Sequence, residues 1–233
     1  MSKLIRHIFP KLLRERLIRI SKQLKNFHSL AFDYGQWGSI WLWKAADNKS
    51  NPIPWYTYPA TEFLEHLDFS RMTVFEYGSG NSTLWWASKS KSLLSVEDDK
   101  AWYSKIAQKI QAEKTQYFLK TDKKEYVEIA QQQADVFIID GSHRRACAEH
   151  VVKIAGGVMI VLDNSDWFPE TTEVLRSSLK WIQIDFHGFG PINGYTWTTT
   201  IFINPKRHQE LVYVKKLGSM CGLKQVSLED KLC

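Results

Sequence analysis

The residues with the clearest chemical potential lie in the stretch TVFEYGSGNST, residues 73–83. A β-branched and aromatic run that passes through Glu76 and then into Gly78-x-Gly80 predicts a buried strand, a tight turn and a helix directly after it. Glycine permits positive φ angles and close approach of a ligand, and the free N–H groups of the helix start can face that ligand. The same pattern also occurs at ordinary strand-to-helix corners, so by itself it indicates a ligand only weakly.

A second acid, Glu97, stands 21 positions after Glu76, at the end of another apolar run. In an open parallel sheet, an acid about 20 residues beyond a glycine turn can accept hydrogen bonds from ribose hydroxyls. The spacing therefore predicts an adenosine-type ligand. A carboxylate here disfavours a 2′-phosphate, and Ser82 and Thr83 stand where dinucleotide-binding proteins have a third glycine, which argues against an ordinary nicotinamide domain.

An alternating series of strands and helices is predicted to position these acids. The runs at residues 136–139 and 158–162 are apolar throughout, which is typical of central parallel strands covered on both faces. They end in Asp140 and in Asp163-Asn164, and a β-hairpin closes the series. Ligands of open α/β sheets bind outside the carboxyl ends of the strands. We therefore expect the acids at the four strand ends to meet at one crevice.

In combination these motifs resemble those of the class I S-adenosylmethionine-dependent methyltransferases. The resemblance covers about residues 59–204 and rests on Glu76-x-Gly78-x-Gly80, Val96-Glu97, Ile139-Asp140-Gly141, Gly157 before a strand, and the terminal hairpin. It implies an α/β, Rossmann-like fold with a seven-stranded, mostly parallel sheet, an antiparallel last strand and helices on both faces. It also implies S-adenosylmethionine as cofactor, with the methionine part at the glycine turn and the ribose at Glu97. The implied cofactor-binding residues are Glu76, Gly78, Gly80, Asn81, Ser82, Glu97, Asp98 and Asp140.

Within that superfamily, Asp140 with Asp163 and Asn164 is similar to the metal site of the catechol-type O-methyltransferases. Asp140-Gly-Ser-His143 is also similar to the Asp-x-x-His motif of macrolide-type sugar O-methyltransferases, where the Asp binds Mg²⁺ and the His is the base. Carboxylate and amide oxygens suit Mg²⁺ or Ca²⁺, and the ion would lower the pKa of a substrate hydroxyl that His143 deprotonates. The alternatives are structural, because Asp140 and the Asp163 turn also suit caps, and His143 suits a hydrogen-bonding role beside the site.

Residues 1–30 carry a charge of +7, from eight Lys and Arg against Glu15 alone, whereas the whole chain carries +6. Apolar residues recur there at three- and four-residue intervals, which predicts a basic amphipathic helix, kinked or restarted at Pro10. Such a helix can bind an anionic membrane surface, can pack on the body with its basic face in solvent, or can bind nucleic acid. Charges interrupt the segment throughout, so it does not read as a cleavable secretory signal, while a mitochondrial presequence remains an alternative.

Residues 31–58 are dense in aromatic rings and prolines and predict a lid of loops and short turns. The rings can stack on a sugar or another flat ligand, or can roof the core. The candidate substrate contacts are Trp55, Tyr56 and, in a loop expected to overhang the crevice, His187. The predicted organisation is a basic helix at 1–30, the lid at 31–58, a methyltransferase catalytic domain at 59–205 and a C-terminal extension at 206–233, for which no structure is predicted.

These patterns predict a metal-assisted, S-adenosylmethionine-dependent methyltransferase that modifies a hydroxyl of a sugar, a glycan or a small polar acceptor. A membrane contact through residues 1–30 would place it at the inner face of the membrane and fit a lipid-linked acceptor. Nucleic acid is an improbable substrate, because the Asn-Pro-Pro-Tyr motif of base methylation is absent. The alternatives are a differently reacting adenosine-ligand enzyme, such as an aminopropyl transferase, and a non-catalytic interaction module.

The cysteines bear on the compartment. Cys147, Cys221 and Cys233 are far apart in the chain and odd in number, which favours neither a disulfide framework nor a zinc site. A reducing, cytoplasmic location is the natural expectation.

Overall fold

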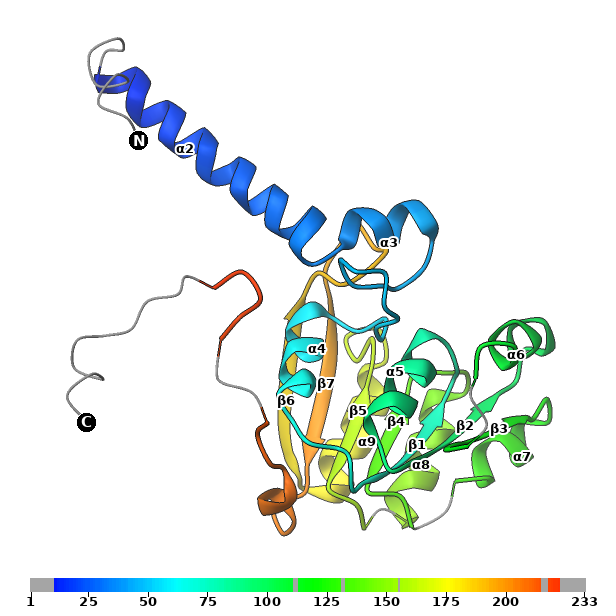
Figure 1. The fold of residues 1–233 in the computed structure, drawn as a ribbon. Coiled ribbons are helices and arrows are strands. Elements are labelled where there is room, and N and C mark those ends of the chain that lie inside the picture. The colour runs from blue at the N-terminus through cyan, green and yellow to red at the C-terminus, as the bar shows by residue number, and fades with distance from the viewer. Residues whose placement is uncertain (1–10, 111–112, 131–132, 155, 215–217, 223–233) are drawn as a thin grey trace.

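A computed structural model of the protein describes residues 11–110, 113–130, 133–154, 156–214 and 218–222 (Figure 1). Its centre is a seven-stranded sheet with the strand order β3-β2-β1-β4-β5-β7-β6. The strands are β1 (Thr73–Tyr77), β2 (Ser92–Glu97), β3 (Thr115–Leu119), β4 (Val136–Ile139), β5 (Met159–Leu162), β6 (Ile182–Gly188) and β7 (Trp197–Ile203).

Strands β1 to β5 pair in parallel, and β7 lies antiparallel to both of its neighbours, β5 and β6. The predicted Rossmann-like fold is therefore confirmed, including the antiparallel last strand and the hairpin that it forms with β6.

Helices cover both faces of the sheet, because side chains along each central strand point alternately to two apolar cores. One core joins Val74 and Ile138 to α4 (Tyr58–Glu65) and α5 (Asn81–Lys89). The other core contains Phe75 and Ile139 and, from the helices, buried residues of α7 (Lys123–Glu128), α8 (Arg144–Ile154) and α9 (Pro169–Leu179). The remaining helix of the sheet region, α6 (Lys100–Ala107), packs against β2 and β3.

The register of the strands brings the acids of the crevice to one level. Tyr77 pairs with Val96 on one side and with Ile139 on the other, and Ile139 pairs with Leu162. The residues that follow these partners are Gly78, Glu97, Asp140 and Asp163. The four neighbouring strands therefore end together, which is the condition for a shared site at this edge.

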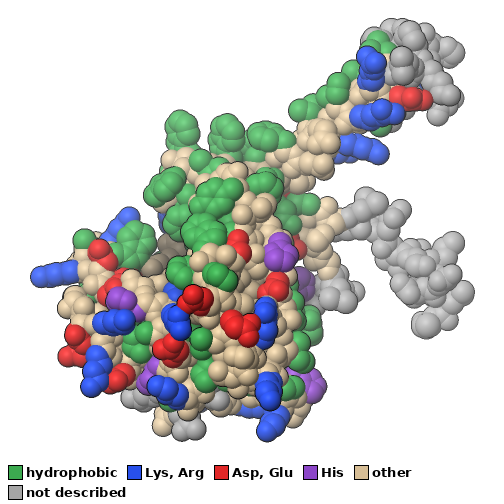
Figure 2. Space-filling view, turned by 180° about the vertical axis from the view of Figure 1, so that it is seen from behind, with side chains coloured by type: hydrophobic (Ala, Val, Ile, Leu, Met, Phe, Trp, Pro, Cys, Tyr) green, Lys and Arg blue, Asp and Glu red, His purple; other side chains and the backbone are tan. Residues whose placement is uncertain are grey.

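The N-terminal part of the described chain is α2 (Lys11–His28), a π-helical turn η1 (Ser29–Asp33) and α3 (Gln36–Leu42). Helix α2 lies within the predicted basic helix, and residues 1–10 lie outside the described residues. Figure 1 shows that α2 leaves the body beside α3 and extends away from it. Figure 2 shows hydrophobic side chains gathered on the body at the place where α2 leaves it. The predicted lid of loops contains a helix, α3, that sequence reasoning did not find.

Part of the C-terminal extension packs on the body. After β7 comes a 3₁₀ turn, η2 (His208–Glu210), and Tyr213 then forms a β-bridge with Leu67. Cys147 is buried in the core and Cys221 is exposed, while Cys233 lies outside the described residues. Over the described part of the chain, no helix is both long and apolar enough to cross a bilayer.

Candidate active site

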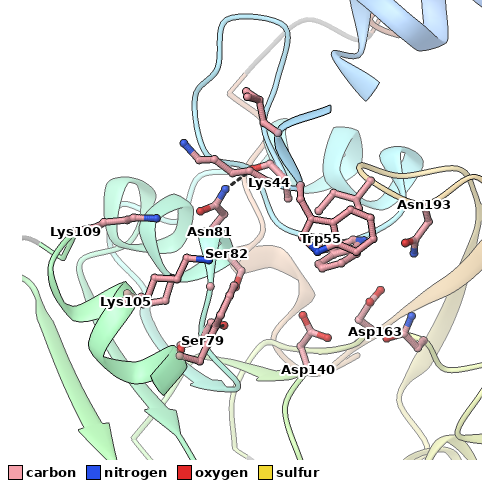
Figure 3. Close-up of a pocket in the computed structure, with 18 of the residues that line it drawn as sticks. Lys44, Trp55, Ser79, Asn81, Ser82, Lys105, Lys109, Asp140, Asp163 and Asn193 are labelled. Atoms are coloured by element: carbon pink, nitrogen blue, oxygen red, sulfur yellow. Dashed lines mark hydrogen bonds between the residues drawn. The ribbon is translucent and has the colours of Figure 1, made fainter. Parts of the chain in front are cut away.

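A pocket of about 890 Å³ opens at the carboxyl ends of the strands, and its size suits a small-molecule ligand (Figure 3). Its floor contains Asp140 and Asp163, and the side nearest the glycine turn contains Gly80, Asn81 and Ser82. Its rim contains aromatic and cationic side chains, which are Trp43, Lys44, Trp55, Trp102, Lys105, Lys109, Trp167 and Tyr195.

Gly78 and Gly80 have different physical roles in the turn. Gly78 has φ of +84°, and a Cβ there would lie 2.4 Å from the Cα of Gly141, so a side chain is excluded by both conformation and space. At Gly80 the nearest heavy atom to such a Cβ is Ser82 Oγ at 3.8 Å. Gly78 thus lets the ends of β1 and β4 approach, whereas Gly80 borders the open pocket.

Glu76 is completely buried beneath this turn. Its Oε2 accepts hydrogen bonds from the hydroxyls of Thr83 at 2.6 Å and Ser95 at 2.7 Å. Its Oε1 is also buried and has no hydrogen-bond partner within the described residues. Burial raises the pKa of Glu76 to about 7, with the surrounding hydroxyls opposing the shift. A buried acceptor without a donor marks a position where a ligand N–H can bind.

Glu97 is held by four donors from the chain. Oε2 accepts from the backbone N–H of Ser79 at 3.0 Å and from its hydroxyl at 2.7 Å. Oε1 accepts from the N–H groups of Asp98 and Asp99, both at 3.0 Å. The acid predicted to bind ribose is therefore at the expected strand end, with its oxygens engaged by the protein and with Ser79, not Glu97, lining the pocket.

Asp140 and Asp163 form an acidic pair in the pocket, and Figure 3 shows both carboxyl groups directed into it. Burial raises the pKa of Asp140 to about 6, and the guanidinium of Arg144 opposes that shift. Burial and the neighbouring Asp140 together raise the pKa of Asp163 well above its usual value. Asp163 Oδ1 accepts hydrogen bonds from Trp197 Nε1 at 3.1 Å and Thr199 Oγ1 at 2.5 Å.

Arg144 lies between the residues predicted to bind a metal. Its Nη2 donates to Asp140 Oδ1 at 2.9 Å, and its Nη1 donates to Asn164 Oδ1 at 3.0 Å and to the carbonyl of Asp163. A divalent ion on these ligands would stand beside a fixed positive charge. Over the part of the chain that the structure describes, no group of three or more His, Cys, Asp or Glu is arranged to hold a metal. Because Arg144 already binds both Asp140 and Asn164, the residues present do not fit the predicted Mg²⁺ site.

The structure does not bring His143 into the pocket with Asp140. His143 has a left-handed backbone, with φ of +54°, and its ring lies near Tyr126 and 4.0 Å from Asp98 Oδ2. Asp98 also accepts a hydrogen bond from Ser142 at 3.1 Å and does not line the pocket. The turn after β4 thus directs residue 143 toward the end of β2, so the predicted Asp-x-x-His arrangement does not form.

Of the three predicted substrate contacts, the structure brings only Trp55 to the pocket. Tyr56 is fully buried in the core, where its hydroxyl accepts a hydrogen bond from Trp86 Nε1 at 3.4 Å. His187 belongs to β6 instead of a loop, and its Nδ1 is 2.7 Å from Thr198 Oγ1 on the paired strand. For these two residues the prediction is wrong, because one roofs the core and the other extends the hairpin.

Several residues that line the pocket or hold its acids were not predicted. Arg144 could have been found, since it stands four positions after Asp140 at the start of a helix, a spacing at which side chains can pair. Trp197 and Thr199, which hold Asp163, come from β7, and their contact depends on that strand lying beside β5. Lys105 and Lys109 extend from α6 and its C-terminal turn to the rim, and no local motif marks them.

Searches against known proteins found no matching family model and no matching curated protein. Among solved structures, the chain is similar to a precorrin-8w decarboxylase from Methanobacterium thermoautotrophicum, with 13% identity, 66% of this chain and 94% of that chain covered, and a TM-score of 0.48. It is also similar to the C-terminal domain of precorrin-6Y C5,15-methyltransferase from Rhodobacter capsulatus, with 12% identity, 62% of this chain and 86% of that chain covered, and a TM-score of 0.47. A third similar structure is TYW2 from M. jannaschii in complex with AdoMet, with 14% identity, 68% of this chain and 79% of that chain covered, and a TM-score of 0.46. These likenesses are too distant to assign an activity, and the strand order given above carries the fold.

Proposed function

We propose that this protein is an S-adenosylmethionine-dependent methyltransferase that transfers the methyl group to a hydroxyl oxygen of a sugar, a glycan or another small polar acceptor. The observation that carries the proposal is the group of acids at the carboxyl ends of the strands. Asp140 and Asp163 line the pocket, Glu76 is buried beneath the glycine turn, and all three have raised pKa values. Among the described residues, Arg144 is the cation that forms an ion pair with these carboxyl groups, so the group favours a ligand that brings further positive charge with it.

The methionine end of the cofactor fits the residues present. Glu76 Oε1 is a buried acceptor that no described residue satisfies, and an ammonium group is the donor that suits it. Gly80 leaves open space at the pocket wall, next to Asn81 and Ser82 at the start of α5.

The ribose end fits with one adjustment. The Ser79 hydroxyl on Glu97 Oε2 is the same kind of donor as a ribose hydroxyl. A ribose hydroxyl can therefore take its place without leaving the carboxylate unpaired, while the three backbone N–H groups keep Glu97 oriented.

The chemistry assigned to the chain is proton removal and alignment. When bound, S-adenosylmethionine supplies a methyl group activated by a positively charged sulfur. Asp140, with a pKa of about 6, is mostly ionised at neutral pH and is suited to accept the proton of the acceptor hydroxyl. Burial and the neighbouring Asp140 raise the pKa of Asp163, and Trp197 and Thr199 hold its carboxyl group beside Asp140, where it can hydrogen-bond the acceptor. Asp140 replaces His143 in this role because it lines the pocket and His143 does not.

The proposed transfer uses no metal ion, since Arg144 already forms an ion pair with Asp140 and donates to Asn164. The rings of Trp55, Trp167 and Tyr195 support a sugar or another flat polar acceptor, because aromatic faces pack well on such groups while Asn193 offers a polar contact.

A second candidate function is an adenosine-fold domain that binds a partner without catalysis. The observation that favours it is the saturation of Glu97 by four protein donors, which a domain without a nucleoside ligand would retain.

Calorimetric titration with S-adenosylmethionine and S-adenosylhomocysteine tests the proposal. We expect micromolar binding to the wild type and a loss of about tenfold or more in Glu97→Ala, since the charge-assisted contact to the ribose hydroxyl disappears. Glu173→Ala, an exposed acid on α9, is the matched control and should bind normally. No binding of either compound would contradict the proposal, and binding without methyl transfer to any hydroxyl compound in an acceptor screen would favour the second candidate.

A further inference from the structure

Helix α3 has its polar residues inside and its apolar residues outside. Gln36 is 8% exposed and Ser39 is 1% exposed, whereas Trp41 is 81% exposed and Leu42 is 60% exposed. Gln36 Nε2 donates to the carbonyls of Gly190 at 3.0 Å and Asn193 at 3.1 Å. Ser39 Oγ donates to the carbonyl of Ala46 at 2.8 Å. The helix is thus fixed to the body through hydrogen bonds, and its apolar side faces away from the body.

The apolar side of α3 continues onto α2. Rings of Phe27, Phe32 and Trp37 contact one another with centroids 6.3 to 6.4 Å apart and join the two helices. Along α2 a stripe of exposed apolar residues leads to this junction, formed by Leu13, Leu17, Ile20, Leu24 and Phe27, while Ile18 is exposed on another side of the helix. On α3 and just after it the exposed residues are Trp37, Ile40, Trp41, Leu42 and Trp43. We call these ten residues the α2–α3 surface (Figure 2). A contiguous group of apolar side chains that is exposed to solvent in this way is typical of a surface that binds a partner.

The charges beside the stripe select the partner. Residues 13–28 contain five cations, Arg14, Arg16, Arg19, Lys22 and Lys25, against Glu15 alone, a charge of +4. A second copy of the chain would bring the same cations against them, and over the described residues the stripe covers two heptads, short of what a stable coiled coil needs. An anionic lipid surface provides both the apolar layer and the opposite charge. Tryptophan, with an apolar body and a polar N–H, is the residue that prefers this boundary.

We propose that the α2–α3 surface binds an anionic lipid membrane, with the stripe and the tryptophans at the level of the headgroups. Leu42 and Trp43 belong both to this surface and to the wall of the pocket, and Lys44 follows directly on the rim. The bound protein therefore holds the mouth of its pocket at the lipid boundary. Resting on the proposed function, this assigns the acceptor to the class of amphiphiles whose polar head carries the hydroxyl while the chain stays in the membrane.

Flotation of the full-length protein with lipid vesicles tests the proposal. Vesicles contain phosphatidylcholine alone or phosphatidylcholine with phosphatidylglycerol, at low and high salt. We expect the wild type to float with the anionic vesicles and to be released by salt. Trp37→Ser/Trp41→Ser and, separately, Arg16→Glu/Arg19→Glu should each lower vesicle affinity by about tenfold or more.

Two matched controls keep the test specific. Ile182→Ser removes an exposed apolar residue on β6, and Lys123→Glu/Lys124→Glu reverses two exposed cations on α7; both should float like the wild type. Circular dichroism melting shows that each variant is folded.

Three results would overturn the proposal. The first is a wild type that does not bind the anionic vesicles even at low salt. The second is that the variants of the α2–α3 surface float as well as the controls. The third is that light scattering shows the wild type to be a dimer and Trp37→Ser/Trp41→Ser to be a monomer. Flotation needs no cofactor and the calorimetric titration needs no membrane, so failure of one proposal is distinguishable from failure of the other.

Discussion

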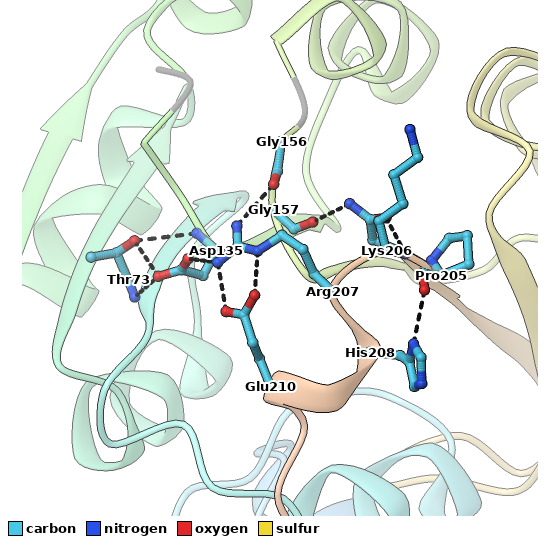
Figure 4. A network of polar contacts seen from close by, with 10 residues as sticks. Thr73, Asp135, Gly156, Gly157, Pro205, Lys206, Arg207, His208 and Glu210 are labelled. Carbon is cyan, nitrogen blue, oxygen red and sulfur yellow. Dashed lines mark hydrogen bonds and ion pairs between the residues drawn. The ribbon is translucent and has the colours of Figure 1, made fainter.

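Two clusters of charged residues lie at opposite ends of the sheet, and they differ in how their charges are compensated. At the amino ends of the strands, Arg207 donates to Asp135 at 3.0 Å, to Glu210 at 2.6 Å and to the carbonyl of Gly156 at 2.8 Å, and Asp135 also accepts from Thr73 (Figure 4). Arg207 lowers the pKa of Glu210 below its usual value. At the carboxyl ends, the pKa values of Glu76 and the Asp140–Asp163 pair are raised.

The difference separates a structural cluster from a functional one. Groups with compensated charges stabilise the fold, since Arg207 ties the chain after β7 to the starts of β1, β4 and β5. Groups with raised acid pKa values cost stability when ionised, and such groups concentrate at sites that bind or react. We therefore expect substitutions of the acids at the carboxyl ends of the strands to affect methyl transfer, and substitutions in the Arg207 cluster at the amino ends to affect stability.

The largest expected effect is on methyl transfer. Asp140→Asn keeps the shape of the side chain but removes the proposed base, so we expect the transfer rate to fall about 10² to 10⁴-fold. The free energy of unfolding should change little, because the asparagine oxygen can still accept from Arg144. Radioactive label transferred from S-adenosylmethionine to an acceptor measures the rate. The matched control is Asp135→Asn, whose transfer rate should equal that of the wild type; a similar loss of rate in both variants would remove the distinction between the two clusters.

A smaller effect is expected on stability at the amino ends. Arg207→Gln removes charge-assisted hydrogen bonds to Asp135 and Glu210, which should cost about 2 kcal/mol and lower Tm by about 5 °C. Arg176→Gln, in an exposed ion pair on α9, should cost less than about 1 kcal/mol. Thermal unfolding followed by circular dichroism gives both values. If Arg207→Gln melts like the wild type while cofactor affinity falls, the assignment of this cluster to stability is wrong.

The sheet was predictable because β4 and β5 are apolar at every position and because β1, β2, β4 and β5 end at an acid or a glycine. The pocket was predictable only in outline. His143 adopts a left-handed backbone, and β6 continues through His187. Neither feature has a local signal in the sequence, so the positions of these two histidines could not be predicted. Arg144 replaces the predicted metal because the helix begins directly after the turn that follows Asp140.

The inverted helix α3 escaped prediction for a physical reason. Periodicity assigns apolar residues to the inside. Here Gln36 takes that position by donating to carbonyls 154 and 157 residues away, and Ser39 by donating to the carbonyl of Ala46, seven residues on. A helix of this kind is recognised only when its surroundings are known.

The central claim is that the carboxyl-end pocket binds a cationic ligand through its acids, and the pH dependence of cofactor affinity tests it most directly. Ionised Glu76 attracts a cation and protonated Glu76 does not, so affinity rises as pH rises through its pKa of about 7. We predict that S-adenosylmethionine binds about tenfold more tightly at about pH 8 than at about pH 6, with a shallower dependence in Glu76→Gln. S-adenosylhomocysteine carries the same ammonium group and should show a similar rise. Affinities that do not change with pH for either compound would contradict the account.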